Sequence, residues 1–100
     1  THLRHMSKLI NIYTLLIRLN NFINIFLLSQ PLIRAFPGCN HVELLRHSED
    51  TTIMFTLSHW ESEENLEQYR QSELFKSTWA KTKVLFREKA QAWTLEEFKP

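Results

Sequence analysis

The pattern of apolar and polar positions in the first third of the chain predicts a strand followed by a long helix. The stretch from Lys8 to Ile17 (KLINIYTLLI) is rich in β-branched and aromatic residues, which is typical of a strand. Apolar side chains then recur every three or four positions and predict one face of a helix that runs to about Ala35: Leu19, Phe22, Ile23, Phe26, Ile33 and Phe36. Pro31 predicts a kink or a break near residues 28–30, because an internal proline removes a backbone hydrogen bond and clashes with the preceding turn.

The middle of the chain predicts two neighbouring antiparallel strands. Phe36-Pro37-Gly38 ends the helix, since the only glycine of the chain can adopt a positive φ there. Residues 39–47 alternate, which places four side chains on one face of a strand: Cys39, His41, Glu43 and Leu45. After a polar turn, residues 51–60 alternate again, with Ile53, Phe55, Leu57 and His59 on one face and Met54, Thr56, Ser58 and Trp60 on the other.

The last third predicts two helix starts and a closing strand. Ser62 and Ser72 are each followed by glutamate, and a serine oxygen can accept hydrogen bonds from the free amides of a first helical turn. Residues Leu66 and Tyr69 then face inward, and a second stripe follows at helical spacing: Phe75, Trp79, Thr82 and Phe86. Residues 90–98 read as a strand. The order βαββαβ predicts a ferredoxin-like α+β fold, in which helices cover one face of a four-stranded antiparallel sheet.

Length and charge limit the classes of partner. One hundred residues suit a single domain, here residues 7–100, with residues 1–6 as a flexible leader. A net charge of +1 provides no general attraction to nucleic acid. The sheet face without helices favours a homodimer, because a small domain gains stability when such a face is covered.

The remaining features of the sequence favour a cytoplasmic protein without a metal. Cys39 is the only cysteine, so no internal disulfide forms, and we interpret it as a buried thiol. The apolar stretch 9–33 is interrupted by Arg18 and several asparagines, so we expect no membrane span and no signal peptide. The histidines show no tight pair at metal-ligand spacing.

Three segments in fixed order carry a resemblance to a known family. They are AFPGC (35–39), FTLSHWES (55–62) and SELF (72–75), and they are followed by Trp79 to Lys83 and by Ala92-Trp93. Together they resemble the antibiotic-biosynthesis-monooxygenase family over roughly residues 19–98. The resemblance implies a dimeric α+β barrel and, in each subunit, a pocket between the sheet and the helices. It also implies oxidation of a small phenolic, quinol or anthrone-like substrate by molecular oxygen, without metal or flavin.

The resemblance and the residue chemistry together suggest a set of candidate site residues. We assign His59, Tyr69 and Trp60 to catalysis: an imidazole can act as a base near neutral pH, a phenol can donate to a substrate oxygen, and an indole can form a wall. We assign substrate contacts to four further residues: Asn11, His41, Phe75 and Trp79. Each assignment has a structural alternative, namely core packing for the aromatic residues and a surface or dimer-interface position for the histidines.

Two alternatives remain at this level. A related branch of the family degrades haem with an axial histidine, but the corresponding position holds Trp79, which cannot ligate iron, so haem degradation is disfavoured. Thr56 and Ala80 also replace polar residues that some oxygenases of the family carry, which favours a non-catalytic dimeric ligand-binding or stress-related protein of the same fold. An open cavity that touches His59 or Tyr69 would favour the enzyme.

Overall fold

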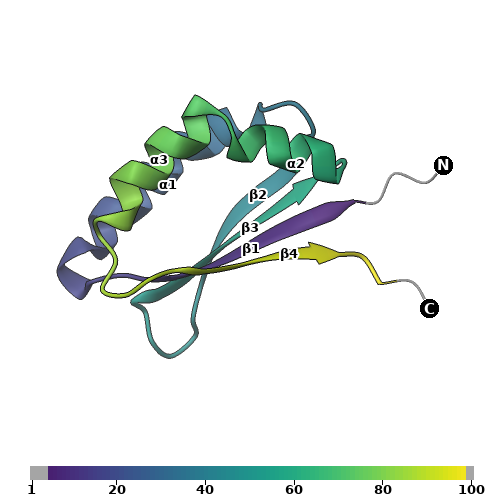
Figure 1. Cartoon of the computed structure of the whole chain (residues 1–100). Coiled ribbons are helices and arrows are strands. Elements are labelled where there is room, and N and C mark those ends of the chain that lie inside the picture. The colour runs from purple at the N-terminus through teal and green to yellow at the C-terminus, as the bar shows by residue number, and fades with distance from the viewer. Residues whose placement is uncertain (1–4, 99–100) are drawn as a thin grey trace.

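Four antiparallel strands form one sheet, and three α-helices lie against one of its faces (Figure 1). This computed structural model describes residues 5–98. The elements are β1 (Met6–Tyr13), a 3-10 turn η1 (Leu16–Arg18), α1 (Leu19–Arg34), β2 (Cys39–Arg46), β3 (Ile53–Trp60), α2 (Glu63–Arg70), α3 (Glu73–Lys83) and β4 (Gln91–Glu96). The strand order in the sheet is β2-β3-β1-β4. The predicted ferredoxin-like α+β fold is therefore confirmed.

Strand β1 begins earlier and ends earlier than the sequence predicts. It starts at Met6, which was assigned to a leader, and residues 1–4 of that leader lie outside the described residues. It ends at Tyr13, opposite Ile53, where its neighbour β3 also begins. Beyond that point Thr14 binds the Thr52 carbonyl through both its backbone N–H and its hydroxyl, and the chain turns into η1. The predicted extension of the strand to Ile17 is wrong: beyond Tyr13 the described residues form only an isolated bridge between Thr14 and Phe86, and residues 16–18 form η1.

Helix α1 continues through Pro31, so of the predicted kink or break, the break does not occur. Phe26 lies before the proline and Ile33 after it, and both belong to the same buried cluster on the sheet. Packing on both sides of Pro31 outweighs the loss of one backbone hydrogen bond. By length and composition alone, the stretch Leu16–Arg34 could cross a membrane, with a mean hydropathy of 1.2. A core helix passes the same test, and the buried side of α1 packs in the core of this domain.

Strand β2 contains a β-bulge that reverses the predicted alternation at its start. Cys39 lies opposite Trp60 and His41 lies opposite His59, so Asn40 is an extra residue on β2. Cys39 and His41 therefore point to opposite faces, and the prediction that they share one is wrong. The prediction that Cys39 is buried is confirmed, and burial raises the pKa of its thiol.

The predicted starts of α2 and α3 are confirmed by their capping hydrogen bonds. Ser62 Oγ accepts from the backbone N–H of Asn65 at 3.1 Å, and Ser72 Oγ accepts from that of Phe75 at 3.1 Å. Gly38 adopts a φ of 85° at the turn into β2, and a Cβ there would lie 2.3 Å from the Asn65 side chain. The turn into β2 and the start of α2 are thereby packed against each other.

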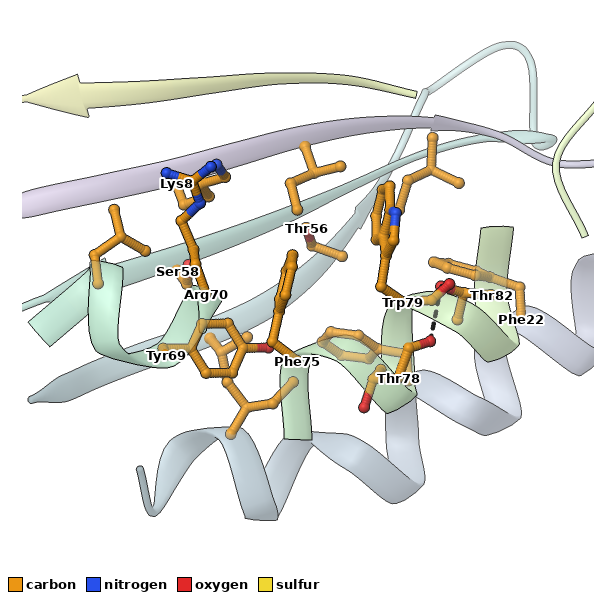
Figure 2. Close-up of a pocket in the computed structure, with 16 residues that line it drawn as sticks. Lys8, Phe22, Thr56, Ser58, Tyr69, Arg70, Phe75, Thr78, Trp79 and Thr82 are labelled. Carbon is orange, nitrogen blue, oxygen red and sulfur yellow. Dashed lines mark hydrogen bonds between the residues drawn. The ribbon is translucent and has the colours of Figure 1, made fainter. Parts of the chain in front are cut away.

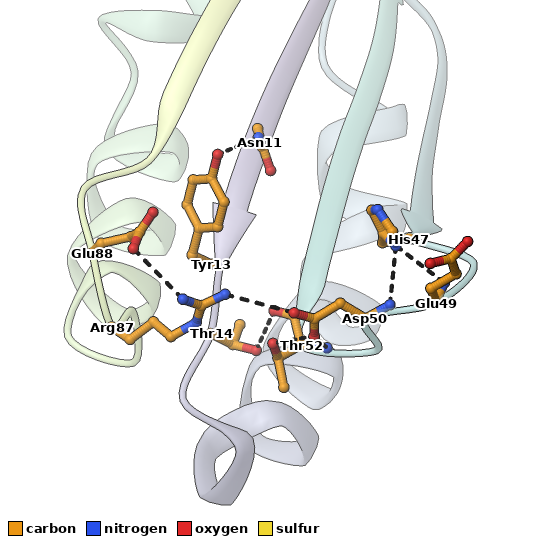
Figure 3. A network of polar contacts seen from close by, with 9 residues as sticks. All are labelled: Asn11, Tyr13, Thr14, His47, Glu49, Asp50, Thr52, Arg87 and Glu88. Atoms are coloured by element: carbon orange, nitrogen blue, oxygen red, sulfur yellow. Dashed lines mark hydrogen bonds and ion pairs between the residues drawn. The ribbon is translucent and has the colours of Figure 1, made fainter.

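A polar network closes the end of the sheet where β1 meets the loop before β4 (Figure 3). The Arg87 guanidinium lies 5.4 Å from the centre of the Tyr13 ring, 3.5 Å from the Glu88 carboxylate and 4.0 Å from that of Asp50. Asp50 in turn accepts from the hydroxyl of Thr52 at 2.6 Å. These contacts hold the edge strand β4 and the β2–β3 turn against the end of β1.

The sheet presents two different faces. The helices cover the side that we call the helix face, which carries the alternate residues Ile12, Met54 and Trp60 of the core. The other side, which we call the open face, carries the intervening residues: Ser7, Leu9, Asn11, Tyr13, His41, Glu43, Leu45, Phe55, Leu57, His59, Trp93 and Leu95. Figure 1 shows no helix on the open face among the described residues.

Candidate functional site

A cavity of about 70 Å³ lies between the helix face of the sheet and the three helices (Figure 2). We call it the aromatic pocket. Its walls are mostly apolar, and every helix and three of the four strands contribute to them. The lining residues are Lys8, Ile10, Ile12, Phe22, Phe26, Ile33, Val42, Thr56, Ser58, Leu66, Tyr69, Arg70, Phe75, Thr78, Trp79 and Thr82.

Aromatic rings from α2 and α3 form one wall of the pocket. Phe75 and Trp79 are four residues apart, so their side chains leave α3 on the same side, and their rings stack with centres 6.0 Å apart and an angle of 10°. The Tyr69 ring meets Phe75 edge to face at 5.3 Å. The sequence predicted all three residues at the site, and the structure brings them together around one cavity.

Tyr69 is buried, and it lines the pocket. Its hydroxyl makes no hydrogen bond to any side chain within residues 5–98, although the ring itself is packed. Burial raises the pKa of this phenol well above its usual value, and the nearby Cys39 adds to the shift. Tyr69 is therefore a neutral phenol that can donate a hydrogen bond to a bound molecule, and it is poorly suited to act as a base.

Trp60 supports the pocket without lining it. Its side chain is completely buried and stacks on the ring of Tyr69, with centres 4.8 Å apart. Its indole Nε1 donates a hydrogen bond to Ser58 Oγ at 2.9 Å. The residue assigned to catalysis on the sequence thus packs behind two groups that do face the cavity, Tyr69 and Ser58.

Two basic side chains lie together at one end of the pocket, as Figure 2 shows. Lys8 extends from β1 beside Ser58 of β3, its partner in the strand register. Arg70 comes from the end of α2 and forms an ion pair with Glu67, with Nη1 and Oε2 3.0 Å apart. Burial lowers the pKa of Lys8, and the charge of Arg70 lowers it further.

Three of the other predicted site residues lie on the open face rather than around the pocket. His59 Nδ1 is 2.7 Å from Ser7 Oγ, and its ring stacks on that of His41 at 5.6 Å. Asn11 Nδ2 donates to the hydroxyl of Tyr13 at 2.8 Å. His59 precedes Trp60 on one strand, and adjacent strand residues point to opposite faces, so the structure separates two groups that the sequence analysis combined.

Sequence reasoning missed the polar end of the pocket. Lys8 is the only charged residue between positions 8 and 17, and it shares the period of Ile10 and Ile12. A charged residue at the same alternate positions as the buried residues of a strand is the signal that could have identified Lys8. Arg70 gave no such signal, because it directly follows Tyr69 on a short polar helix and resembles an ordinary surface residue.

Metal-binding side chains do not gather near the pocket. Across the described part of the chain, no three side chains of histidine, cysteine, aspartate or glutamate lie close enough to hold a metal ion. The described histidines do not line the pocket either. What the pocket can do chemically therefore depends on aromatic walls, hydroxyl groups and two cations.

Comparison with known proteins gives one sequence family and many similar structures. The sequence profile described as antibiotic biosynthesis monooxygenase matches residues 19–81. A conserved protein from Methanosarcina mazei is 14% identical, with a TM-score of 0.91 over 96% of this chain and 95% of that chain. A candidate antibiotic biosynthesis monooxygenase from Nitrosomonas europaea is 8% identical, with a TM-score of 0.89 over 100% and 96%.

A second candidate monooxygenase, from Bordetella bronchiseptica, is 22% identical, with a TM-score of 0.84 over 96% of this chain and 99% of that chain. At such identities these likenesses establish the fold alone. A search of curated proteins gives no match.

Proposed function

Because this chain belongs to the antibiotic biosynthesis monooxygenase family, we propose that it oxidises a small phenolic, quinol or anthrone-like compound with molecular oxygen in the aromatic pocket. We propose further that it needs neither a metal nor an organic cofactor. The observation that carries the proposal is the pocket itself, which combines an aromatic wall with a polar end on one side. Such a site can hold an aromatic ring in a fixed orientation and exclude water from it.

The chemistry requires only that the pocket produce and protect an electron-rich anion. A bound phenol loses its proton, and the cations Lys8 and Arg70 stabilise the resulting phenolate. The anion transfers one electron to dioxygen, and the two radicals combine to form a carbon–oxygen bond. Loss of water from this peroxide leaves a quinone, so that one phenol and one dioxygen give one quinone and one water.

Individual residues have distinct parts in this proposal. Phe75 and Trp79 hold the ring of the substrate, and the Tyr69 hydroxyl donates a hydrogen bond to one of its oxygen atoms. Lys8 takes the place of His59 as the ionisable group beside the substrate: it lines the pocket, its ammonium stabilises the phenolate, and the proton of the phenol passes to water. Trp60 positions Tyr69 and Ser58 from behind.

We also propose a cytoplasmic homodimer in which the open face of each subunit packs on its partner. Large apolar side chains remain exposed there, including Leu45, Trp93 and Leu95. A second copy would cover them, and Asn11, His41 and His59 would then lie at the interface. In this arrangement the pocket and the interface use opposite faces of one sheet.

One observation favours the alternative of a non-catalytic ligand-binding protein. The cavity of about 70 Å³ is small for an enzyme that must admit both an aromatic compound and dioxygen. A protein of this fold could bind a small ring there without transforming it. Oxygen consumption separates these two functions directly.

The test is oxygen uptake by purified, metal-free protein with a panel of quinols, anthrones and catechols. Tyr69→Phe removes the hydroxyl that faces the pocket and keeps the ring, so we expect uptake to fall about tenfold or more, as for loss of one transition-state hydrogen bond. Tyr13→Phe is the matched control, because Tyr13 is the only other tyrosine and lies on the open face. Its rate should equal that of the wild type.

The outcome distinguishes the two functions. Saturable uptake above autoxidation that falls in Tyr69→Phe and not in Tyr13→Phe supports the oxygenase. Binding of the same compounds without uptake supports the ligand-binding protein. Uptake that is equal in all three proteins removes Tyr69 from the proposed site.

A further inference from the structure

We propose that the polar end of the aromatic pocket binds a carboxylate, so that the preferred ligands are small aromatic acids. Lys8, Ser58 and Arg70 would hold the acidic group while Phe75 and Trp79 contact the ring. This inference rests on the proposed function only in taking the pocket as a ligand site. It adds the class of substrate, which the aromatic wall alone leaves open.

Lys8 carries a charge that no other residue in the range 5–98 pairs with directly. Its side chain is half-buried at the pocket, and its ammonium makes no hydrogen bond or ion pair with the residues from 5 to 98. Removing an ammonium from water is costly unless an anion or hydrogen-bond acceptors replace the water. Burial lowers the pKa of Lys8, the charge of Arg70 lowers it further, and the charge of Glu67 offsets only part of this shift. An anionic ligand would provide the missing partner.

The carboxylate of Glu67 does not fill this role. One of its oxygens accepts from Arg70 at 3.0 Å, and the other accepts from Gln71 Nε2 at 2.9 Å. Both oxygens are thus engaged on the outer side of α2. Two cations and one carboxylate leave one positive charge at this end of the pocket, which suits a ligand with a single negative charge. Arg70 uses only Nη1 for Glu67 and retains further N–H donors.

Ser58 adds a directed hydroxyl group. Its oxygen accepts from the indole of Trp60, so the hydroxyl hydrogen is left to donate elsewhere, and it meets no acceptor in the described part of the chain. Lys8 and Ser58 are partners in the register of β1 and β3, which sets them side by side on the helix face. An ammonium, a guanidinium and a hydroxyl together provide charge-assisted hydrogen bonds to a carboxylate.

The test compares two ligands that differ only in charge, 4-hydroxybenzoate and 4-hydroxybenzamide, titrated calorimetrically into the full chain under nitrogen. We expect the acid to bind about tenfold or more tightly, as for one charge-assisted hydrogen bond. Lys8→Met and Arg70→Gln should each weaken binding of the acid far more than binding of the amide, so that most of this preference is lost. Lys76→Met is the control, because Lys76 is exposed on α3 and does not line the pocket.

The results separate this inference from the proposed oxidation. Equal affinities of the wild type for acid and amide, or a preference that survives in Lys8→Met, would overturn the carboxylate site and leave the pocket as a neutral phenol site. The absence of binding by either ligand overturns the inference as well. A preference for the acid, without oxygen uptake when phenolic acids are supplied, supports the carboxylate site and contradicts the proposed monooxygenase activity. Circular dichroism of each variant shows whether the fold is kept.

Discussion

The two faces of the sheet are built from the same strands but differ in how far their polar groups are hydrogen-bonded. On the open face most polar side chains pair with one another: Ser7 contacts His59, Asn11 donates to Tyr13, and Tyr13 donates to Gln91 at 3.2 Å, whereas Asn11 Oδ1 is buried and meets no partner in the described part of the chain. On the helix face, the hydroxyl of Tyr69 and the ammonium of Lys8 line a cavity and contact no partner among the described residues. Unpaired polar groups beside a cavity are typical of a ligand site, whereas a paired and partly apolar surface is typical of an assembly interface.

Alternation along a strand makes this division possible. Neighbouring residues such as Ser58 and His59 point to opposite faces, so one strand can serve both a pocket and an interface without compromise. The face of a residue therefore decides which function it can have, more than its chemical type does. The following three changes test the division between the faces, in order of decreasing expected effect.

The largest effect is expected from Trp60→Ala, which removes the most deeply buried side chain of the helix face. Loss of a large buried aromatic group costs about 3–5 kcal/mol in the free energy of unfolding, and here it also leaves Tyr69 without its stacking partner. Urea denaturation measures the change. Trp93→Ala is the control: Trp93 is 43% exposed on the open face, so its loss should cost far less within the subunit, and any cost at the proposed dimer contact shows as a dependence on protein concentration. Equal costs would contradict the assignment of the core to one face.

A smaller effect, on assembly rather than folding, is expected from Leu9→Glu. Leu9 lies between Leu57 and Trp93 at the centre of the open face, so a carboxylate there would be buried against the partner in the proposed homodimer. An unpaired charge in an interface should weaken the dimer about a hundredfold or more. Light scattering after size-exclusion chromatography measures the mass, and circular dichroism verifies that the subunit remains folded.

The control for that experiment is Leu28→Glu, the same substitution on the outward side of α1, where Leu28 is exposed. It should leave the dimer intact. If Leu28→Glu yields the monomer and Leu9→Glu does not, the contact between subunits involves α1, and the open face has another function.

The elements of the fold were predictable where the signal is local. The faces of β3 follow from simple alternation, and the starts of α2 and α3 follow from Ser62 and Ser72, whose capping bonds involve residues three positions away. The end of β1 and the bulge at Asn40 were not predictable, because each depends on where a distant partner strand lies. The break predicted at Pro31 does not occur for a similar reason, because tertiary packing of α1 outweighs the local cost of the proline.

The site was predictable only in part. Tyr69, Phe75 and Trp79 were identified from the inward stripes of α2 and α3, and they line one pocket. His59 was assigned to catalysis together with Trp60, although the predicted alternation already placed the two on opposite faces. Lys8 and Arg70 meet only in the folded state, since they lie far apart in the sequence. A pair formed by tertiary structure leaves no motif in a single sequence.

The smallest expected effect is a change in the pH dependence of stability in Lys8→Met. The pKa of Lys8 is lower in the folded protein than its ordinary value of 10.5, so the folded state binds fewer protons than the unfolded state in the range between these two pKa values. The cost of keeping the ammonium protonated is therefore fully present below the folded pKa, and it disappears as the pH rises through this range to 10.5. Lys8→Met should be more stable than the wild type at neutral pH, by less than about 1 kcal/mol because solvent screens a half-exposed charge, and this advantage should shrink at pH 10. Urea denaturation of both proteins at the two pH values measures the difference, in which the other titrating groups cancel, and Lys76→Met should show no such dependence. An advantage of the same size at both pH values would mean that Lys8 is well hydrated, and the helix face would then lack the unpaired charge that distinguishes it from the open face.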